Sequence, residues 1–134
     1  EQLAQSIIQG CEGSVEKKGF DKTLDPRLAT VFDYLHDNRD RWVSAEECAA
    51  LVFLSRSRFL HFFKEHTKCT FRRAQLWIRI THSMPMLKEK GLSETAFQFG
   101  FYDNAHYCRA FRENLGFSPQ AFIKLASLYN TSLA

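Results

Sequence analysis

The side chains best suited to chemistry in this 134-residue chain are basic, and they concentrate in one stretch. Residues 25–54 contain six acidic residues against three basic ones, whereas the only acidic residue within 55–79 is Glu65. The basic residues there are Arg56, Arg58, Lys64, Lys68, Arg72, Arg73 and Arg79. Because lysine and arginine neutralise phosphate, this stretch is a candidate for binding a phosphate-bearing partner. The net charge of +3 permits a nucleic-acid partner without requiring one.

Other kinds of chemistry find little support in the sequence. It contains no nucleophile with a matching base, no carboxylate pair in a plausible cleft and no glycine-rich phosphate loop, so we expect neither an enzyme nor a cofactor. The cysteines at 11, 48, 69 and 108 form no CxxC pair, which argues against a disulfide framework or a zinc ribbon. His61, His66 and Cys69 do not have the spacing of a zinc site. Without a signal peptide or a long apolar run, we expect a cytoplasmic protein with no membrane partner.

Short helices must position the basic side chains. Asp25 before Pro26 predicts an N-cap and a first helix that ends near Asn38. Ser44 and Glu47 form a capping-box pattern that predicts a second helix. A third helix is predicted to begin at Ser55. Its inner face is an apolar stripe of Phe59, Phe62 and Phe63. Because about three residues separate the second and third helices, the pair is predicted to form a helix-turn-helix.

A longer helical pattern follows, from residue 71 to Gly91. Pro85 lies inside it, and we expect a kink or break near residues 81–84 because proline lacks a backbone donor. Another short helix, capped by Ser93, then precedes the stretch GFYDNAHYCRAFRENLGFSP at residues 100–119. In that stretch Gly100 suits a turn with positive φ, and Gly116 suits a left-handed helix end.

The two helix pairs form an internal repeat. Ala49 and Ala96 are 47 residues apart, and one extra residue in the second turn makes the later offset 48. The pairs at that offset are Phe59 with Tyr107, Phe63 with Phe111, and Lys64 with Arg112. At the positions of Gly100, Gly116 and Pro119 the first copy has Phe53, Lys68 and Phe71, so we expect its turn to be made differently.

This doubled pattern, over residues 24–124, resembles the AraC/XylS-type DNA-binding domain of bacterial transcription regulators. The resemblance rests on three features: GFYDNAHYCRAFRENLGFSP, SRSRFLHFFKEHT, and Arg79, Ser83 and Leu87 in the predicted connecting helix. The resemblance implies an all-α fold in which two helix-turn-helix subdomains are joined by a longer connecting helix. It implies double-stranded DNA and RNA polymerase as partners, more often for an activator, and an upstream effector or dimerisation domain.

We divide the chain accordingly. Residues 1–24 are predicted to be a linker or the tail of an upstream domain, and the first residue, Glu1, suggests a piece of a longer polypeptide. Residues 25–80 hold the first subdomain and the start of the connecting helix. Residues 81–127 hold the rest of that helix and the second subdomain, and residues 128–134 form a C-terminal tail.

Residues that point away from the aromatic stripe are the candidates for contacting DNA. An α-helix fits the major groove, where arginine reads guanine, asparagine reads adenine, and small apolar groups touch the thymine methyl. The predicted base-reading residues are Ser57, Arg58, Leu60, His61, Asn104, Ala105, His106 and Arg109. The predicted phosphate-binding residues are Ser44, Lys64, Arg72, Arg73, Ser93 and Arg112.

Two alternatives stay open on the sequence alone. A basic helical face is usually only a solvated face, although its repetition argues against that interpretation here. The chain could also be a helical module that binds another protein and uses the repeat as a scaffold. DNA binding through phosphates should weaken steeply with salt, whereas an interface with a hydrophobic centre should change much less.

Overall fold

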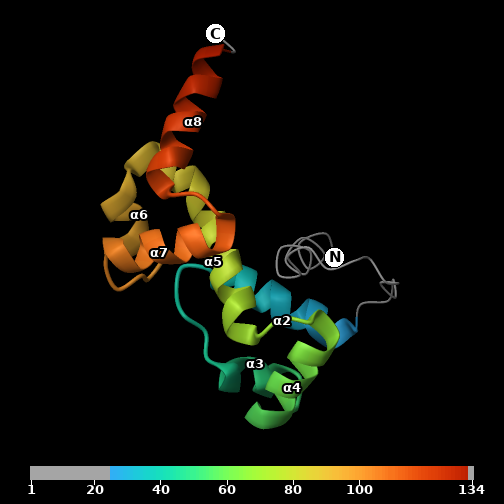
Figure 1. Cartoon of the computed structure of the whole chain (residues 1–134). Coiled ribbons are helices and arrows are strands. Elements are labelled where there is room, and N and C mark those ends of the chain that lie inside the picture. The colour runs from blue at the N-terminus through green and yellow to red at the C-terminus, as the bar shows by residue number, and fades with distance from the viewer. Residues whose placement is uncertain (1–24, 133–134) are drawn as a thin grey trace. The chain divides into compact units, whose positions relative to one another are not determined.

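A computed structural model describes residues 25–132 of the chain, with side chains to residue 129, and all of its regular elements are helices (Figure 1). The predicted linker at residues 1–24 lies outside the described residues. Contacts divide the chain after Ile78 into two compact units, each described by itself below. The helix α5, Phe71–Lys90, contributes its first part to unit 1 and its second part to unit 2.

Unit 1 contains α2 (Pro26–Asp37), α3 (Ala45–Leu51), α4 (Arg56–Thr67) and the start of α5. As predicted, Asp25 caps α2 ahead of Pro26 and the helix ends near Asn38, which is its C-cap. The core is aromatic: the fully buried Phe63 packs against Phe32 and Phe71, with ring centroids 5.7 and 5.6 Å apart. The phenylalanine stripe of the sequence is therefore a hydrophobic core face, as predicted.

Unit 2 contains the end of α5, α6 (Leu92–Gln98), α7 (Asn104–Leu115) and α8 (Pro119–Ser132). Tyr107 and Phe111 of α7 are fully buried, with ring centroids 5.8 Å apart. The Tyr107 hydroxyl forms a 2.7 Å hydrogen bond with the buried hydroxyl of Ser83 on α5. This bond gives the polar end of Tyr107 a partner inside the core, as a buried hydroxyl requires.

The turns of the two units repeat the same hydrogen bond. In unit 1 the Leu54 amide donates to the Ala49 carbonyl at 3.0 Å, and in unit 2 the Phe101 amide donates to the Ala96 carbonyl at 3.0 Å. Gly100 has a φ of 73°, as its position suggested. Phe53 takes a φ of 59°, so the expectation of a differently made first turn is wrong. The fold requires the left-handed backbone there and Phe53 adopts it without the freedom of glycine.

Pro85 does not break the connecting helix. The helix α5 is continuous from Phe71 to Lys90 with Pro85 inside it, so of the predicted kink or break the break is wrong, and the kink stays a prediction. Ser83 and Leu87 on either side are buried, which holds both flanking turns in the core of unit 2. Pro85 itself is exposed, so its ring lies on the solvent side of the helix.

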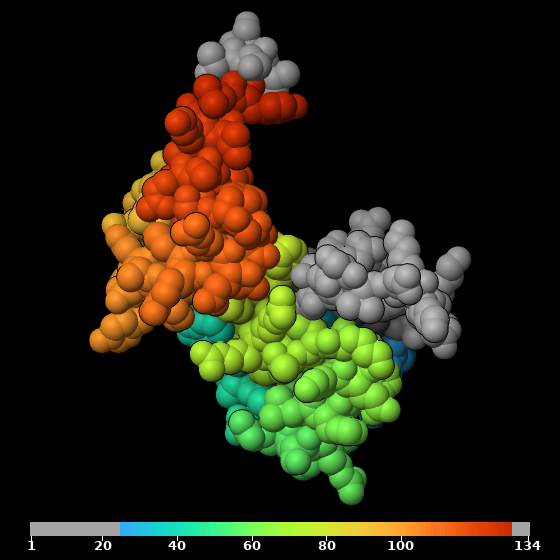
Figure 2. Space-filling view, in the orientation of Figure 1, coloured from blue at the N-terminus to red at the C-terminus, as the bar shows by residue number. Residues whose placement is uncertain are grey.

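The C-terminal end of unit 2 is helical further than the sequence suggested. The helix α8 continues to Ser132, so most of the predicted tail at residues 128–134 is the end of that helix (Figure 1). In the space-filling view this segment projects from the rest of unit 2 (Figure 2). Leu125, Leu128 and Tyr129 on its last described turns are exposed.

Candidate nucleic-acid interface

The first candidate reading helix is α4, which begins where Ser55 accepts a hydrogen bond from the Arg58 amide at 3.3 Å. Its inner residues Phe59 and Phe63 are fully buried. Ser57, Arg58 and His61 are exposed on the opposite side, as predicted, and Leu60 is half-buried at the margin. The helix therefore presents a polar, partly basic ridge to solvent, while its aromatic face is fixed in the core.

A shallow hollow of about 470 Å³ lies along one side of this ridge. Its lining residues are Arg27, Leu54, Ser57, Arg58, His61, Phe62 and Glu65. Arg27 comes from α2, where it pairs with Asp25 at 2.9 Å and lies over the Phe62 ring at 4.4 Å. Sequence reasoning did not connect Arg27 to the site, because only the packing of α2 against α4 brings it beside Arg58.

The phosphate candidates Lys64, Arg72 and Arg73 are all exposed in unit 1. Arg79, the last of the basic residues counted in this stretch, is only 1% exposed and lies over the Phe101 ring at 5.6 Å. It belongs to the interior of unit 2 and contributes no charge to the surface of unit 1. The basic surface is therefore narrower than the residue count suggested.

Ser44 caps α3 in a complete capping box with Glu47, as predicted. Arg41 donates two hydrogen bonds to the Glu47 carboxylate, at 2.8 and 3.2 Å, and the Tyr34 hydroxyl donates a third at 2.8 Å. These bonds, that of Arg41 foremost, hold the pKa of Glu47 at about 2. Glu47 therefore remains ionised at neutral pH and fixes the start of the helix that leads into the first turn.

Ser93 does not cap α6, so this part of the prediction is wrong. The N-cap is Gly91, with a φ of 83°, and Ser93 lies inside the first turn of the helix. The carbonyl of Gly91 accepts hydrogen bonds from the Thr95 amide and hydroxyl, at 3.3 and 2.7 Å, which starts α6 there. The 47-residue offset that pairs Ala49 with Ala96 also pairs Ser44 with Gly91, and applying it here would have placed the cap correctly.

The second candidate reading helix is α7, whose N-cap Asp103 accepts a hydrogen bond from the His106 amide at 2.6 Å. Ala105 and Arg109 are exposed on its outer side, and Arg112 is exposed one turn further along. The predicted surface of this helix therefore contains one arginine in the middle of the ridge and a second near its end.

Two other predicted readers of α7 are engaged within unit 2. The side chain of Asn104 donates to the Ser93 hydroxyl at 2.8 Å and so ties α7 to α6. The His106 ring lies edge-on to Phe101 at 5.3 Å, and its Nδ1 accepts from the Tyr102 amide at 3.3 Å. This bond places the proton of the neutral ring on Nε2. His106 therefore supports the turn, and Nε2 is the atom with which it can donate to a partner.

The described residues form no metal cluster, and the buried Cys48 is held as a thiol. No group of three or more histidine, cysteine or acidic side chains between residues 25 and 129 is placed to hold a metal ion. Burial raises the pKa of Cys48 to about 12, which keeps it a thiol. No described helix is long and apolar enough to cross a bilayer.

Comparisons with known proteins agree with this geometry. The sequence profile of the family described as "Helix-turn-helix domain" matches residues 48–124, which is more than half of the chain. The chain is 24% identical over 128 residues to XylDLEGF operon transcriptional activator 2 of Pseudomonas putida, covering 92% of this chain and 81% of that protein. It is 31% identical over 102 residues to the HTH-type transcriptional activator RhaS of Escherichia fergusonii, covering 75% of this chain.

Solved structures show the same fold. A transcriptional regulator from Chromobacterium violaceum, described by its AraC-type DNA-binding domain, superposes with a TM-score of 0.69 at 19% identity. The match covers 74% of this chain and 90% of that one. The chain spans only 37% of the RhaS relative and 40% of the regulator YpdC of Escherichia coli. Much of each of these two longer relatives therefore lies outside the matched part.

Proposed function

We propose that this chain, which belongs to the AraC-type family of helix-turn-helix DNA-binding domains, recognises a specific duplex sequence through α4 and α7. The observation that carries the proposal is the repeat, because both units place a capped, partly basic helix with its aromatic face buried and its polar face in solvent. A helix of this kind fits the major groove, where base edges are distinguishable. The two helices then enter successive major grooves about one helical turn apart.

In this proposal the exposed residues have different roles, namely base reading, support of the second turn and phosphate binding. Arg58 and Arg109 read guanine through its O6 and N7 atoms, and Ser57, His61 and Ala105 contact neighbouring bases. Asn104 and His106 support the second turn through the bonds described above, and His106 can add a contact through Nε2. Lys64, Arg72, Arg73 and Arg112 bind phosphates and fix the register of the helices on the duplex.

The role of the whole protein is proposed from its relatives. Two of them are named as transcriptional activators, and this supports an activator that works in the cytoplasm with RNA polymerase. Several relatives are more than twice as long as the matched segment, which supports an effector or dimerisation domain elsewhere in the protein.

The proposal is tested by measuring binding to a duplex selected by this chain from a random pool and to a scrambled duplex. We expect a marked preference for the selected duplex and a fall of several orders of magnitude in affinity between 50 and 200 mM salt. Equal binding to both duplexes would refute specific recognition. Binding that changes little with salt would favour the protein-interaction alternative.

A further inference from the structure

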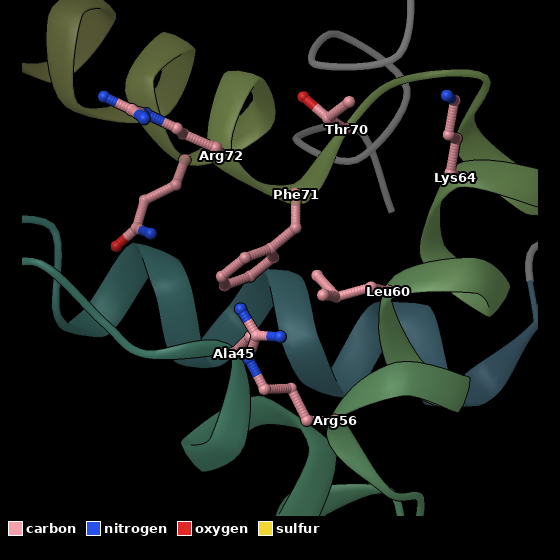
Figure 3. A pocket seen from close by; sticks show the side chains of 8 residues that line it. Ala45, Arg56, Leu60, Lys64, Thr70, Phe71 and Arg72 are labelled. Carbon is pink, nitrogen blue, oxygen red and sulfur yellow. The ribbon is translucent and has the colours of Figure 1, made fainter.

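Outside the two reading ridges, a hollow beside α4 and the outer side of α8 are open to a partner. The hollow has a volume of about 440 Å³ and lies between α4 and the start of α5. In Figure 3 Lys64 and Arg72 extend away from it in opposite directions, and Arg56 is the charged side chain that extends toward the Phe71 ring. Arg56 already pairs with Glu46 at 2.9 Å. The hollow therefore gathers little free charge, and the outer side of α8 is the stronger candidate.

The helix α8 is anchored to unit 2 along one side. Pro119 at its first position is buried, and Phe122 packs against the fully buried Phe111 with ring centroids 6.2 Å apart. Ile123 and Ala126 lie on the same side of the helix as Phe122 and are half-buried. These contacts fix the orientation of α8 and so determine which of its residues face away from unit 2.

A different side of α8 carries an apolar stripe. Leu125, Leu128 and Tyr129 are three and four residues apart, so they share one side of the helix. Their exposed fractions are 60%, 58% and 67%. The end of the helix also projects from the rest of unit 2 in Figure 2. The stripe is therefore an apolar surface open to solvent, of the kind that marks a contact with another protein.

The charge pattern of α8 narrows the choice of partner. The only charged residue in the sequence from 119 to 134 is Lys124, whereas a solvated helix face is ordinarily rich in charge. Because each residue turns an α-helix by about 100°, Lys124 lies at the edge of the stripe, about 100° from Leu125. The stripe thus offers nothing to a partner that binds through charge. Two such stripes, however, can meet without placing like charges opposite each other.

The size of the stripe limits the strength of such a contact. Three side chains from each of two copies bury roughly 600 Å² in total, about half of the roughly 1,200 Å² of the smallest stable interfaces. A contact of this size leaves the free chain mostly monomeric. Two copies on neighbouring sites of one duplex have an effective concentration in the mM range, at which a weak contact forms.

We infer that the stripe of Leu125, Leu128 and Tyr129 pairs with the same stripe of a second copy of this chain, so that two copies bind adjacent DNA sites cooperatively. The contact is isologous, since each copy offers the same residues to the other. Spacings of three and four residues are those of a seam between two helices. The pairing itself requires no DNA, whereas the cooperativity rests on the proposed function.

The first experiment compares Leu125→Glu with Ser127→Glu. Both variants add one negative charge to α8, but residue 127 lies about 200° from Leu125 around the helix and so outside the stripe. Sedimentation equilibrium at chain concentrations up to about 1 mM measures self-association, and thermal melting checks folding. The parent and Ser127→Glu should dimerise weakly, with a Kd of about 0.1 to 1 mM. Leu125→Glu should dimerise at least about tenfold more weakly, because the pairing buries two like charges in an apolar contact.

The second experiment measures cooperativity on DNA. Duplexes contain one selected site or two adjacent ones, with the spacing varied over one helical turn. At the best spacing the parent and Ser127→Glu should fill the second site about tenfold more tightly than the first. Leu125→Glu should fill both sites independently, with the same affinity for a single site as Ser127→Glu.

The outcomes separate the inference from the proposed function. Equal self-association of Leu125→Glu and Ser127→Glu would overturn the inference and leave the stripe to a different protein. A parent that stays monomeric and fills two sites independently at every spacing would overturn it as well. If the parent prefers no duplex sequence, the proposed function fails, while the sedimentation comparison still decides whether the stripes pair.

Discussion

The two helix-turn-helix units make the same backbone turns with different residues. Where unit 2 has Gly100 and Gly116, with φ of 73° and 83°, unit 1 has Phe53 and Lys68, both with a φ of 59°. Phe53 is 95% exposed, so packing of its side chain does not compensate for the strained backbone. The repeated hydrogen bonds impose the conformation, and glycine only lowers its free-energy cost.

Lys68 shows how such a conformation is held without glycine. Its amide donates to the Lys64 carbonyl at 2.9 Å, as the Gly116 amide donates to the Arg112 carbonyl at 2.8 Å. In unit 1 the buried Thr67 hydroxyl also accepts from the Cys69 amide at 3.2 Å and donates to the Phe63 carbonyl at 2.7 Å. These bonds fix the chain on both sides of Lys68, so the helix end forms without glycine, although the left-handed backbone still costs free energy there.

The largest effect should come from removing the central aromatic residue of either unit. Phe63→Ala and Phe111→Ala each leave a cavity in a fully buried position and should each cost about 3 to 5 kcal/mol. Both tryptophans, Trp42 and Trp77, lie in unit 1, so their fluorescence reports that unit during thermal melting. Phe63→Ala should shift the fluorescence melt, whereas Phe111→Ala should shift circular dichroism more than fluorescence. Equal shifts in both signals for both variants would mean that the units unfold together.

The second largest effect is a loss of base discrimination, which distinguishes the contribution of α4 from that of α7. Arg58→Ala and Arg109→Ala should each cost about 1 to 3 kcal/mol of discrimination, in different segments of the selected duplex, because each removes one bidentate contact. Affinities for duplexes with single base changes measure this, and unchanged melting curves serve as the control. Loss of preference in the same segment for both variants would contradict the assignment of two separate readers.

A smaller effect tests the left-handed positions. Lys68→Gly should stabilise unit 1 by about 1 kcal/mol, and Gly116→Ala should destabilise unit 2 by a similar amount. A Cβ added at Gly116 would meet none of the described residues beyond its own stretch of backbone within 4 Å, so we attribute the loss to backbone strain. Denaturant titrations measure both changes, with Lys68→Ala as a control that keeps the strain. A destabilised Lys68→Gly variant would mean that the lysine side chain contributes more than its backbone costs.

The smallest effect concerns the caps of the two units. Because the folded pKa of Glu47 is about 2, below its ordinary value of 4.5, its contribution is complete above pH 4.5 and is lost as the pH falls toward 2. Gly91, the equivalent cap of unit 2, makes no side-chain bond. Glu47→Gln should therefore reduce the acid sensitivity of tryptophan fluorescence between pH 4.5 and 2. A variant as acid-sensitive as the parent would mean that other carboxylates control unit 1.

Local sequence patterns predicted where several helices begin and which face of α4 is buried. The caps at Asp25 and Ser44, the start of a helix at Ser55 and the aromatic stripe of α4 follow from side-chain chemistry and helical spacing, and the structure confirms them. The positive φ of Phe53 and Lys68 could not be predicted, because residue preference disfavours it and only the closure of the turn and the helix end imposes it. Pro85 within a continuous helix also depends on tertiary packing.

The surface was predicted less completely than the fold. The exposure of Arg58, His61 and Arg109 followed from their positions opposite the core. The burial of Arg79 and the placement of Arg27 and Arg56 depend on contacts between helices, which periodicity within one helix does not specify. The roles of the exposed residues on DNA remain predictions for the experiments above.

The most direct test of two reading units in one chain is selection of bound duplexes from a random pool with the parent and with Arg109→Ala. We predict that the parent enriches two sequence segments centred about one helical turn apart, and that Arg109→Ala retains one segment and loses preference in the other. Enrichment of a single segment by the parent, or of both segments unchanged by Arg109→Ala, would contradict the account.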